Sequence, residues 1–312
     1  YKSELPNPYA SVKLPIFLLV TTIFTTLTAG FFLTIGFLSA SGNGQLASIH
    51  SLKDPLTLLQ SLTFSFALLS ILLAHEMGHY IACRLHGIQC TLPYVIPAPP
   101  ILLIPGLGLI PVNPFGTFGA IIRIRSPFRS NQQIYDIGIA GPLAGFVTII
   151  PLLALGVILS NEMQWTENET GYLRFGEPLL FKIAVFVFFK GDPHLINLHP
   201  IGWAAWFGLL ATSLNLLPFG QLDGGHVVYA LFGEKRHKMI SAGLLGTLVA
   251  LSIFSFPTPS YIFFAMILFY LGFKHPYPMQ QNPLDFKRRW LSLLGLVVFI
   301  VSFIPIPITL VE

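Results

Sequence analysis

The chain has 312 residues, of which 54% are hydrophobic and only 10% are charged. Soluble domains carry about 25% charged residues, so this composition excludes an ordinary soluble protein and predicts a polytopic membrane protein. The formal net charge of +4 is too small to indicate a nucleic-acid-binding protein, and no basic stretch is interleaved with aromatic residues in a polar context.

Cysteine content and the start of the chain add two expectations. Cys83 and Cys90 are the two cysteines, and because two do not make a disulfide framework we expect both to be free thiols. The first apolar run is too long for the h-region of a cleavable signal peptide. The sequence begins at Tyr1 without a methionine, which leaves open whether a segment precedes it.

The first two predicted helices span the membrane. Residues 14–40 form an apolar, threonine-rich run that ends in the flexible segment 41–44. The next helix covers residues 56–85. Asp54 and Pro55 are typical of a helix start, because an acidic residue favours the amino end and proline fits the first turn, and Gly87 is a stop signal.

The second helix contains the pattern His75-Glu76-Met77-Gly78-His79. His75 and His79 are four residues apart, so they lie on one helical face and can bind one metal ion. Glu76 lies one residue round from that face, as in the H-E-x-x-H motif of zinc hydrolases, where Glu is the general base. The alternative is two core histidines bound to carbonyls, but ionisable groups inside a membrane helix are costly and usually functional.

Residues 91–125 are apolar but hold seven prolines and four glycines, which excludes a simple spanning helix. Irregular backbone at membrane depth is tolerated only where it is buried in protein or lines a wet cavity. Residues 117–124 have β-branched and then alternating side chains. We therefore expect a re-entrant loop with a short β-hairpin beside the histidine helix; the alternative is an ordinary interfacial loop.

The third predicted span covers residues 134–159. Its Gly141-xxx-Gly145 spacing predicts close helix contact, and we expect a small-residue packing face with no chemistry attached. Residues 161–177 are polar and acidic. The apolar run 179–189 is too short to cross a bilayer, so we expect a helix that lies at the membrane surface.

A further span, residues 201–217, is followed by a break and a helical continuation to residue 232. Pro218 and three glycines interrupt the helix there, which frees backbone groups for a ligand. Spans at 239–256, 261–273 and 290–308 complete a count of seven, of which the thirteen-residue run is the shortest. The predicted fold class is an all-α polytopic membrane protein with about six to seven transmembrane helices.

Lysine and arginine positions predict the orientation. Of the seventeen, thirteen lie on one side and would be cytosolic if the amino terminus is cytosolic. The other four are Lys53, Arg174, Lys182 and Lys190. This topology puts His75 and His79 a few turns from the cytosolic face, in a bacterial cytoplasmic membrane or an organelle membrane.

A catalytic zinc usually has three protein ligands and one water, so a third ligand is needed. Asp223 lies in the broken helix and needs a strong partner such as a metal; we expect it to be the ligand. Asp136 lies in the first turn of its helix, where the dipole favours carboxylates. Cys83 is four residues after His79, but three ligands on one helix cannot easily close around one ion. His226 is a nearby donor or, as we favour, an interfacial residue.

Two motifs together resemble the site-2 protease family of intramembrane zinc metalloproteases: the histidine motif, and Asn215-x-x-Pro218-x-x-x-Leu222-Asp223-Gly224. The resemblance covers residues 56–232, including the glycine-containing segments 116–119 and 141–145. No PDZ-like or CBS-like insert is present in this chain, unlike in some relatives.

The resemblance implies regulated intramembrane proteolysis, with a single-span membrane protein as substrate. It implies one Zn²⁺ held by His75, His79 and Asp223, with Glu76 as base and Asn215 holding the substrate backbone. We expect one membrane-embedded domain over residues 1–312, with a catalytic core at about 56–232 and peripheral helices at 14–40 and 239–308. The substrate's identity and the oligomeric state stay open.

Two other readings are weaker. A zinc transporter with an H-E-x-P-H helix would have proline at Gly78 and a preceding His-Asn-x-x-Asp helix, and neither is present. An inactive family member acting as a scaffold is disfavoured by Glu76. A substrate helix must unwind before its carbonyls become available, and residues 117–124 are a hypothetical strand-pairing site for the unwound segment.

Overall fold

The structure is a computed structural model that describes residues 12–41, 54–104, 108–111, 113–163, 172–254, 260–273, 275–304 and 308–311. The predicted flexible residues 42–44, the acidic stretch 164–171 and the joint 255–259 lie outside this part. The helices in chain order are α1 (Lys13–Ala40), α2 (Pro55–Leu85), α3 (Asn131–Ile158), α4 (Leu179–Phe188), α5 (Pro200–Asn215), α6 (Asp223–Phe254), α7 (Ser260–Leu271) and α8 (Phe286–Ser302). The strands are β1 (Tyr94–Pro97), β2 (Ile101–Ile104), β3 (Gly108–Pro111), β4 (Thr117–Ile121), β5 (Asn161–Glu162), β6 (Tyr172–Phe175), β7 (Ile196–Asn197) and β8 (Ile308–Val311).

The first three long helices confirm the first three predicted spans. α1, α2 and α3 have 28, 31 and 28 residues, and among the described helices these three are long and apolar enough to cross a membrane. At 1.5 Å per residue each exceeds the roughly 30 Å of a bilayer core. Phe24 and Phe66 are 72% and 73% exposed, as expected for side chains that face lipid. The chain is therefore a membrane protein.

The count of seven spans stays a prediction. α5, α7 and α8 have 16, 12 and 17 residues, fewer than the roughly 20 that a perpendicular span needs. α6 has 32 residues but consists of two helices that meet at Gly233, whose φ is 78° and ψ is 175°. The predicted continuation to residue 232 is confirmed by this bend.

The ends of α2 follow the predicted signals. The Asp54 carboxylate accepts a hydrogen bond from the Thr57 backbone N–H at 3.0 Å, and Pro55 occupies the first turn. This capping satisfies an amide that has no partner within the helix. At the other end, Gly87 has a φ of +66°, a left-handed conformation that glycine adopts at low cost.

The predicted hairpin is present as two nested pairs of strands. β1 pairs with β4 in antiparallel register, Val95 opposite Ala120, with an irregularity after Ile96. Between them, β2 pairs with β3. The outer pair, β1 and β4, is attached to α1 by two hydrogen bonds. Thr22 Oγ1 donates to the Val95 carbonyl at 3.1 Å, and Thr25 Oγ1 donates to the Gly116 carbonyl, just before β4, at 2.6 Å. Two threonines of the threonine-rich first span therefore attach it to the hairpin.

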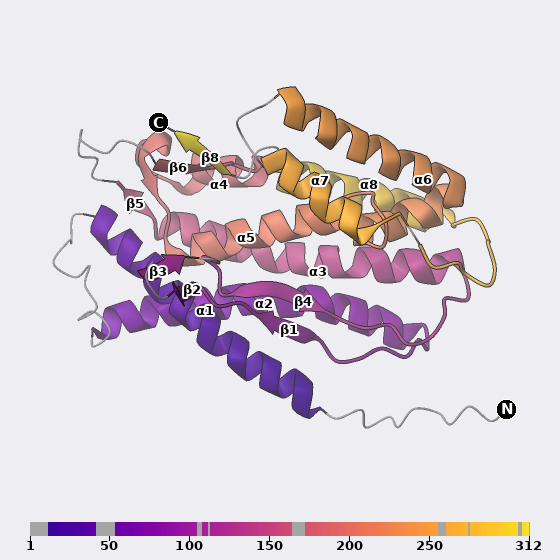
Figure 1. Ribbon diagram of the computed structural model, residues 1–312, viewed down its shortest axis with the longest axis horizontal. Helices are drawn as coiled ribbons and strands as arrows, with labels where there is room; N and C mark the ends of the chain where they lie inside the picture. The colour runs from indigo at the N-terminus through magenta and orange to yellow at the C-terminus, as the bar shows by residue number, and fades with distance from the viewer. Residues whose placement is uncertain are drawn as a thin grey trace.

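α3 is the central helix. α2, α3 and α5 run roughly parallel, while α1 crosses them at an angle (Figure 1). The amino half of α3, including Ile134 and Ile137, packs with parts of α2 and α6. Its carboxyl half, including Ile149 and Leu153, packs with α4 and α5. α3 therefore sets the spacing between the helix with the histidine motif and the helices that follow.

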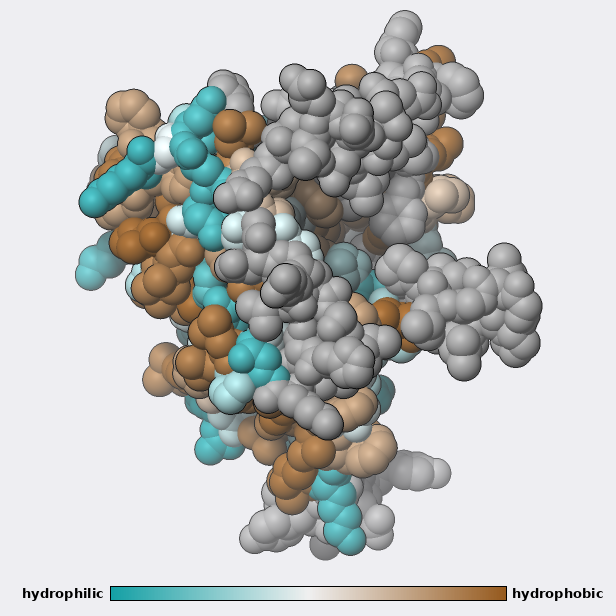
Figure 2. All heavy atoms as spheres, turned by 90° about the vertical axis from the view of Figure 1, so that its left-hand side faces the viewer, coloured by the Kyte–Doolittle hydropathy of each residue, from teal (hydrophilic) through white to brown (hydrophobic). Residues whose placement is uncertain are grey.

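Short strands that the sequence did not predict lie at the end of the molecule that faces the viewer in Figure 2, where hydrophilic side chains form a band among hydrophobic ones. β5 pairs with β7. The Asn197 amide donates to the Phe37 carbonyl at 2.8 Å and to Asn161 Oδ1 at 2.9 Å, which ties the end of α1 to β5 and β7.

The boundaries of the last predicted span need correction. The last span was expected at residues 290–308, whereas α8 begins at Phe286 and ends at Ser302, and β8 pairs with β6 from Ile308. Asp285 caps the helix earlier, since its carboxylate accepts from the Arg288 N–H at 2.9 Å. Prolines in the sequence at 305 and 307 disfavour a helix beyond that point. The membrane-surface position of α4 stays a prediction; the helix buries Phe181 and Ala184 and leaves Phe186 87% exposed.

Candidate active site

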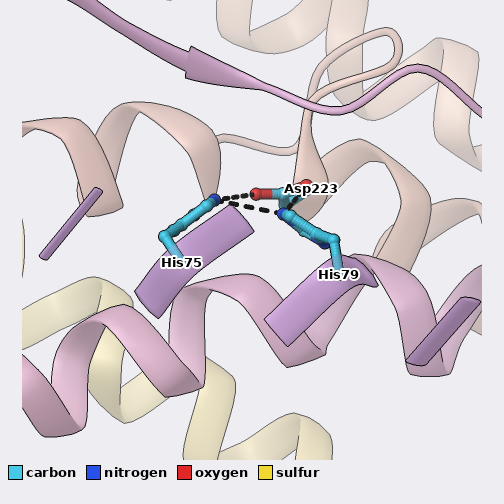
Figure 3. Close-up of side chains that lie close together, drawn as sticks. All are labelled: His75, His79 and Asp223. Atoms are coloured by element: carbon cyan, nitrogen blue, oxygen red, sulfur yellow. Dashed lines mark hydrogen bonds and ion pairs between the residues drawn. The ribbon is translucent and has the colours of Figure 1, made fainter. Parts of the chain in front are cut away.

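The structure brings His75, His79 and Asp223 together (Figure 3). His75 and His79 point from one face of α2, with their Nε2 atoms 3.1 Å apart. Asp223, the first residue of α6, places Oδ2 at 3.2 Å from His75 Nε2 and Oδ1 at 3.3 Å from His79 Nε2. Both histidines are buried. Within the described residues, this is the one group of three such side chains whose ligand atoms converge.

The spacing of these atoms fits one zinc ion. Zinc bonds to nitrogen and carboxylate oxygen are about 2.0–2.2 Å long, so neighbouring ligand atoms in a tetrahedron lie roughly 3.3–3.6 Å apart. The two imidazole nitrogens are 3.1 Å apart, and each lies 3.2 or 3.3 Å from a different oxygen of Asp223, which is close to that edge length. With one ligand atom taken from each residue, the three atoms lie within 4.8 Å of one another. Two imidazoles and one carboxylate also form the usual protein ligand set of a catalytic zinc.

The orientation of His79 supports the same conclusion. Its Nδ1 lies 2.6 Å from the Ile137 carbonyl oxygen of α3, and since a carbonyl only accepts, Nδ1 carries the proton. In the neutral ring Nε2 is then unprotonated and faces Asp223 Oδ1, another acceptor. Two acceptors at 3.3 Å need a cation between them, either a metal ion or a proton on Nε2. A carbonyl on the far nitrogen is also the usual partner of a metal-binding histidine.

Glycines of α3 allow this close approach, which corrects the expectation of a packing face without chemistry. A Cβ added at Gly141 would lie 2.1 Å from His79 Nε2, and one at Gly145 would lie 3.2 Å from His75 Cβ. On the facing side, a Cβ at Gly78 would lie 2.4 Å from the Ala140 carbonyl. The Gly-xxx-Gly spacing was visible in the sequence, but the ring that it faces was not.

The loop that presents Asp223 is equally tight. Residues 216–222 form turns between α5 and α6. A Cβ at Gly224 would lie 1.9 Å from the Leu216 carbonyl oxygen, and one at Gly225 would lie 2.5 Å from the Gly220 carbonyl. The two glycines after Asp223 therefore let the start of α6 pack directly on the preceding turn. This is the predicted break in the helix.

Glu76 is 5% exposed and lies beside the three converging side chains. The backbone N–H of Ile122, the residue after β4, is hydrogen-bonded to its carboxyl group. This contact joins the outer hairpin to the residue that the sequence selected as the base.

Asn215, the last residue of α5, also reaches the site. Its Nδ2 lies 3.3 Å from His75 Nε2. The structure therefore brings all five predicted site residues to one place, from α2, α5 and the start of α6.

The other candidates lie elsewhere. Asp136 is in the second turn of α3, not the first, because Ser130 caps the helix earlier than expected. Its carboxylate accepts from Arg288 Nε at 2.7 Å and Nη2 at 2.6 Å, and lies 2.8 Å from His86 Nε2. An ion pair therefore holds it, in place of the expected helix dipole.

Cys83 and Cys90 are free thiols, as predicted. Cys83 packs in the cluster shared by α2, α3 and α6, outside the metal-binding group. The interfacial position of His226 stays a prediction. Its Nδ1 lies 2.7 Å from His275 Nε2, and its Cβ lies against Gly138.

Comparison with known proteins agrees with this geometry. Residues 63–256 match the family model described as peptidase family M50. The chain is 30% identical over 189 residues to a probable zinc metalloprotease, EGY1 (chloroplastic), of Arabidopsis thaliana, which covers 59% of this chain and 32% of the relative. It is 28% identical over 233 residues to EGY2 (chloroplastic) of Oryza sativa subsp. indica, which covers 72% and 38%. The chain thus spans about a third of the length of these relatives.

Proposed function

We infer, since this chain belongs to peptidase family M50, that it is an intramembrane zinc metalloprotease. Its proposed substrate is a single-span membrane protein, cut within or near the transmembrane segment. The observation that carries this proposal is the buried group of His75, His79 and Asp223, with Glu76 beside it, on a membrane-length helix. When bound, zinc supplies a Lewis acid that lowers the pKa of a coordinated water to about 7.

Side chains of the chain bind the metal, transfer the proton and stabilise the oxyanion. His75, His79 and Asp223 hold the metal. Glu76 accepts the proton of the attacking water and returns it to the leaving amine nitrogen, so that one water is consumed for each peptide bond broken. The Asn215 amide donates to the substrate carbonyl oxygen as negative charge develops on it.

The test of this function uses the full chain reconstituted in lipid vesicles. We expect one zinc per chain and cleavage of a single-span protein that is included in the same vesicles. Zinc flux into the vesicles without cleavage would contradict the proposal and favour a transporter.

Asn215→Ala is expected to lower kcat about 100-fold, the usual effect of removing one donor to a developing oxyanion. The zinc content should stay at the wild-type value, because Asn215 contacts His75 but is outside the metal-binding group. Metal analysis and cleavage rates measured on the same preparation check this. Loss of zinc in the variant would show that Asn215 only holds His75 in place.

We propose that the outer hairpin, β1 and β4, supports an unwound substrate. β4 pairs with β1 on one edge, and within the described residues its other edge has no strand partner. Ile122, which follows β4, is hydrogen-bonded to Glu76. An extended segment paired along the open edge would therefore lead to the base. Main-chain hydrogen bonds of this kind do not depend on substrate sequence.

Proline substitutions test this pairing. Neighbouring residues of an antiparallel strand direct their amides to opposite edges, so one of Ala120→Pro and Ile121→Pro removes an N–H from the open edge. For that variant kcat/KM should fall about tenfold, the value of one hydrogen bond of about 1.4 kcal/mol. Zinc per chain should not change. Wild-type cleavage by both variants would exclude strand pairing along β4.

We also propose seven spans, with the active site toward the cytosolic side, because of the distribution of lysine and arginine. The chloroplastic relatives support an organelle membrane. Labelling of single cysteines placed at positions 235–238, from each side of the membrane, tests the sidedness.

A further inference from the structure

The linker between α7 and α8 contains residues 275–280, which we call the strap. The backbone N–H groups of Met279 and Gln280 donate to the carbonyls of Phe128 and Arg129, each at 3.0 Å. The strap is thus attached to the segment that leads into α3, at the right-hand edge of Figure 1. The sequence assigned it no role.

His275 joins the strap to the first part of α6. Its Nδ1–H donates to the Pro276 carbonyl at 2.8 Å, and burial lowers the pKa of His275 to about 3, so the ring is neutral. Its Nε2 is therefore an acceptor, and His226 Nδ1–H donates to it at 2.7 Å. Tyr229 stacks on the same ring, with centroids 4.0 Å apart and planes within 11°. Two residues of α6 thus fix one imidazole of the strap.

His226 is one helical turn after Asp223, at the point where α6 meets α3. A Cβ added at Gly138 would lie 2.7 Å from His226 Cβ and 3.2 Å from the Asp223 carbonyl oxygen. The adjacent residue of α3, Ile137, supplies the carbonyl that orients His79. A shift of His226 relative to α3 would therefore change the separation of Asp223 from His79.

We propose that His226 and His275 are positioning residues of the metal centre, which hold Asp223 at binding distance through the hydrogen bond between α6 and the strap. This proposal rests on the proposed zinc site. It makes His275, in the linker between α7 and α8, a support of the metal centre, although no described strap residue belongs to the metal-binding group. Removal of either imidazole should weaken zinc binding without removal of a ligand.

The test measures zinc affinity without any cleavage assay. The full chain in detergent is stripped of metal, and zinc is titrated against a chromophoric chelator. His275→Ala should weaken binding about tenfold, at the lower end of the effect of residues that orient metal ligands. His275→Gln should restore most of the affinity, because its amide oxygen can accept from His226. The visible spectrum of the Co²⁺ form should shift in the alanine variant and return in the glutamine variant.

Tyr277→Phe is the matched control in the same strap. It removes the hydrogen bond from Tyr277 to Glu234, which lies beyond the bend at Gly233, and zinc affinity should stay within twofold. The double variant, with alanine at both His226 and His275, should bind zinc no more weakly than either single alanine variant. Wild-type affinity of His275→Ala, failure of glutamine to restore it, or additive effects in the double variant would each overturn the proposal. A wild-type chain that binds no zinc would instead overturn the proposed function.

Discussion

Glu76→Gln is expected to lower kcat by about 10²–10⁴-fold, the usual contribution of a general base, while zinc stays bound. Glutamine has the same shape as glutamate but cannot accept the proton of the attacking water. Its amide oxygen can still accept from the Ile122 N–H that contacts Glu76, so the hairpin should keep its position. The measurement combines zinc analysis with cleavage of a single-span substrate in vesicles.

The control for this variant is Glu177→Gln, which removes an exposed carboxylate 3.9 Å from Lys182 on α4. Exposed ion pairs of this kind contribute little to the stability of a protein. Cleavage by this variant should therefore equal that of the wild type. Equal cleavage by Glu76→Gln and wild type would remove Glu76 from the mechanism. Loss of zinc from Glu76→Gln would instead assign Glu76 to metal binding.

Gly141→Ala is expected to reduce zinc affinity by about 100-fold or more, beyond the 10–100-fold effect of residues that orient ligands. The new Cβ would lie 2.1 Å from His79 Nε2 and within 2.5 Å of both adjacent ring carbons. Contacts below 3.0 Å cannot persist, so the ring must move. Movement would also break its 2.6 Å hydrogen bond to the Ile137 carbonyl. The same chelator titration measures the loss.

Other glycines provide graded controls for this variant. A Cβ at Gly36 in α1 or Gly243 in α6 would meet nothing within 4 Å, so alanine there should leave zinc binding unchanged and favour the helix by about 1 kcal/mol. Gly145→Ala should have an intermediate effect, because its Cβ would lie 3.2 Å from His75 Cβ. Wild-type zinc affinity in Gly141→Ala would contradict the placement of α3 against His79.

The sequence predicted those features that depend on neighbouring residues. The capped start of α2 at Asp54 and its end at Gly87 follow from local hydrogen bonds and backbone conformation. The placement of His75 and His79 on one face follows from helix geometry. Long apolar runs predicted α1, α2 and α3 because the thickness of a bilayer sets their length. The broken helix after residue 217 pointed to Asp223 as the third ligand, and the family motif added Asn215 to the candidate site.

Tertiary structure decided the features that depend on what lies opposite a residue. Asp223 lies 148 residues after His75, and no local periodicity determines that its carboxylate comes within 3.3 Å of both imidazoles. The role of Gly141 also depends on a residue far away in the sequence. Its spacing from Gly145 predicted close packing, but a glycine acts here by the absence of a side chain. Only the position of the His79 ring against α3 turns that absence into a requirement for metal binding.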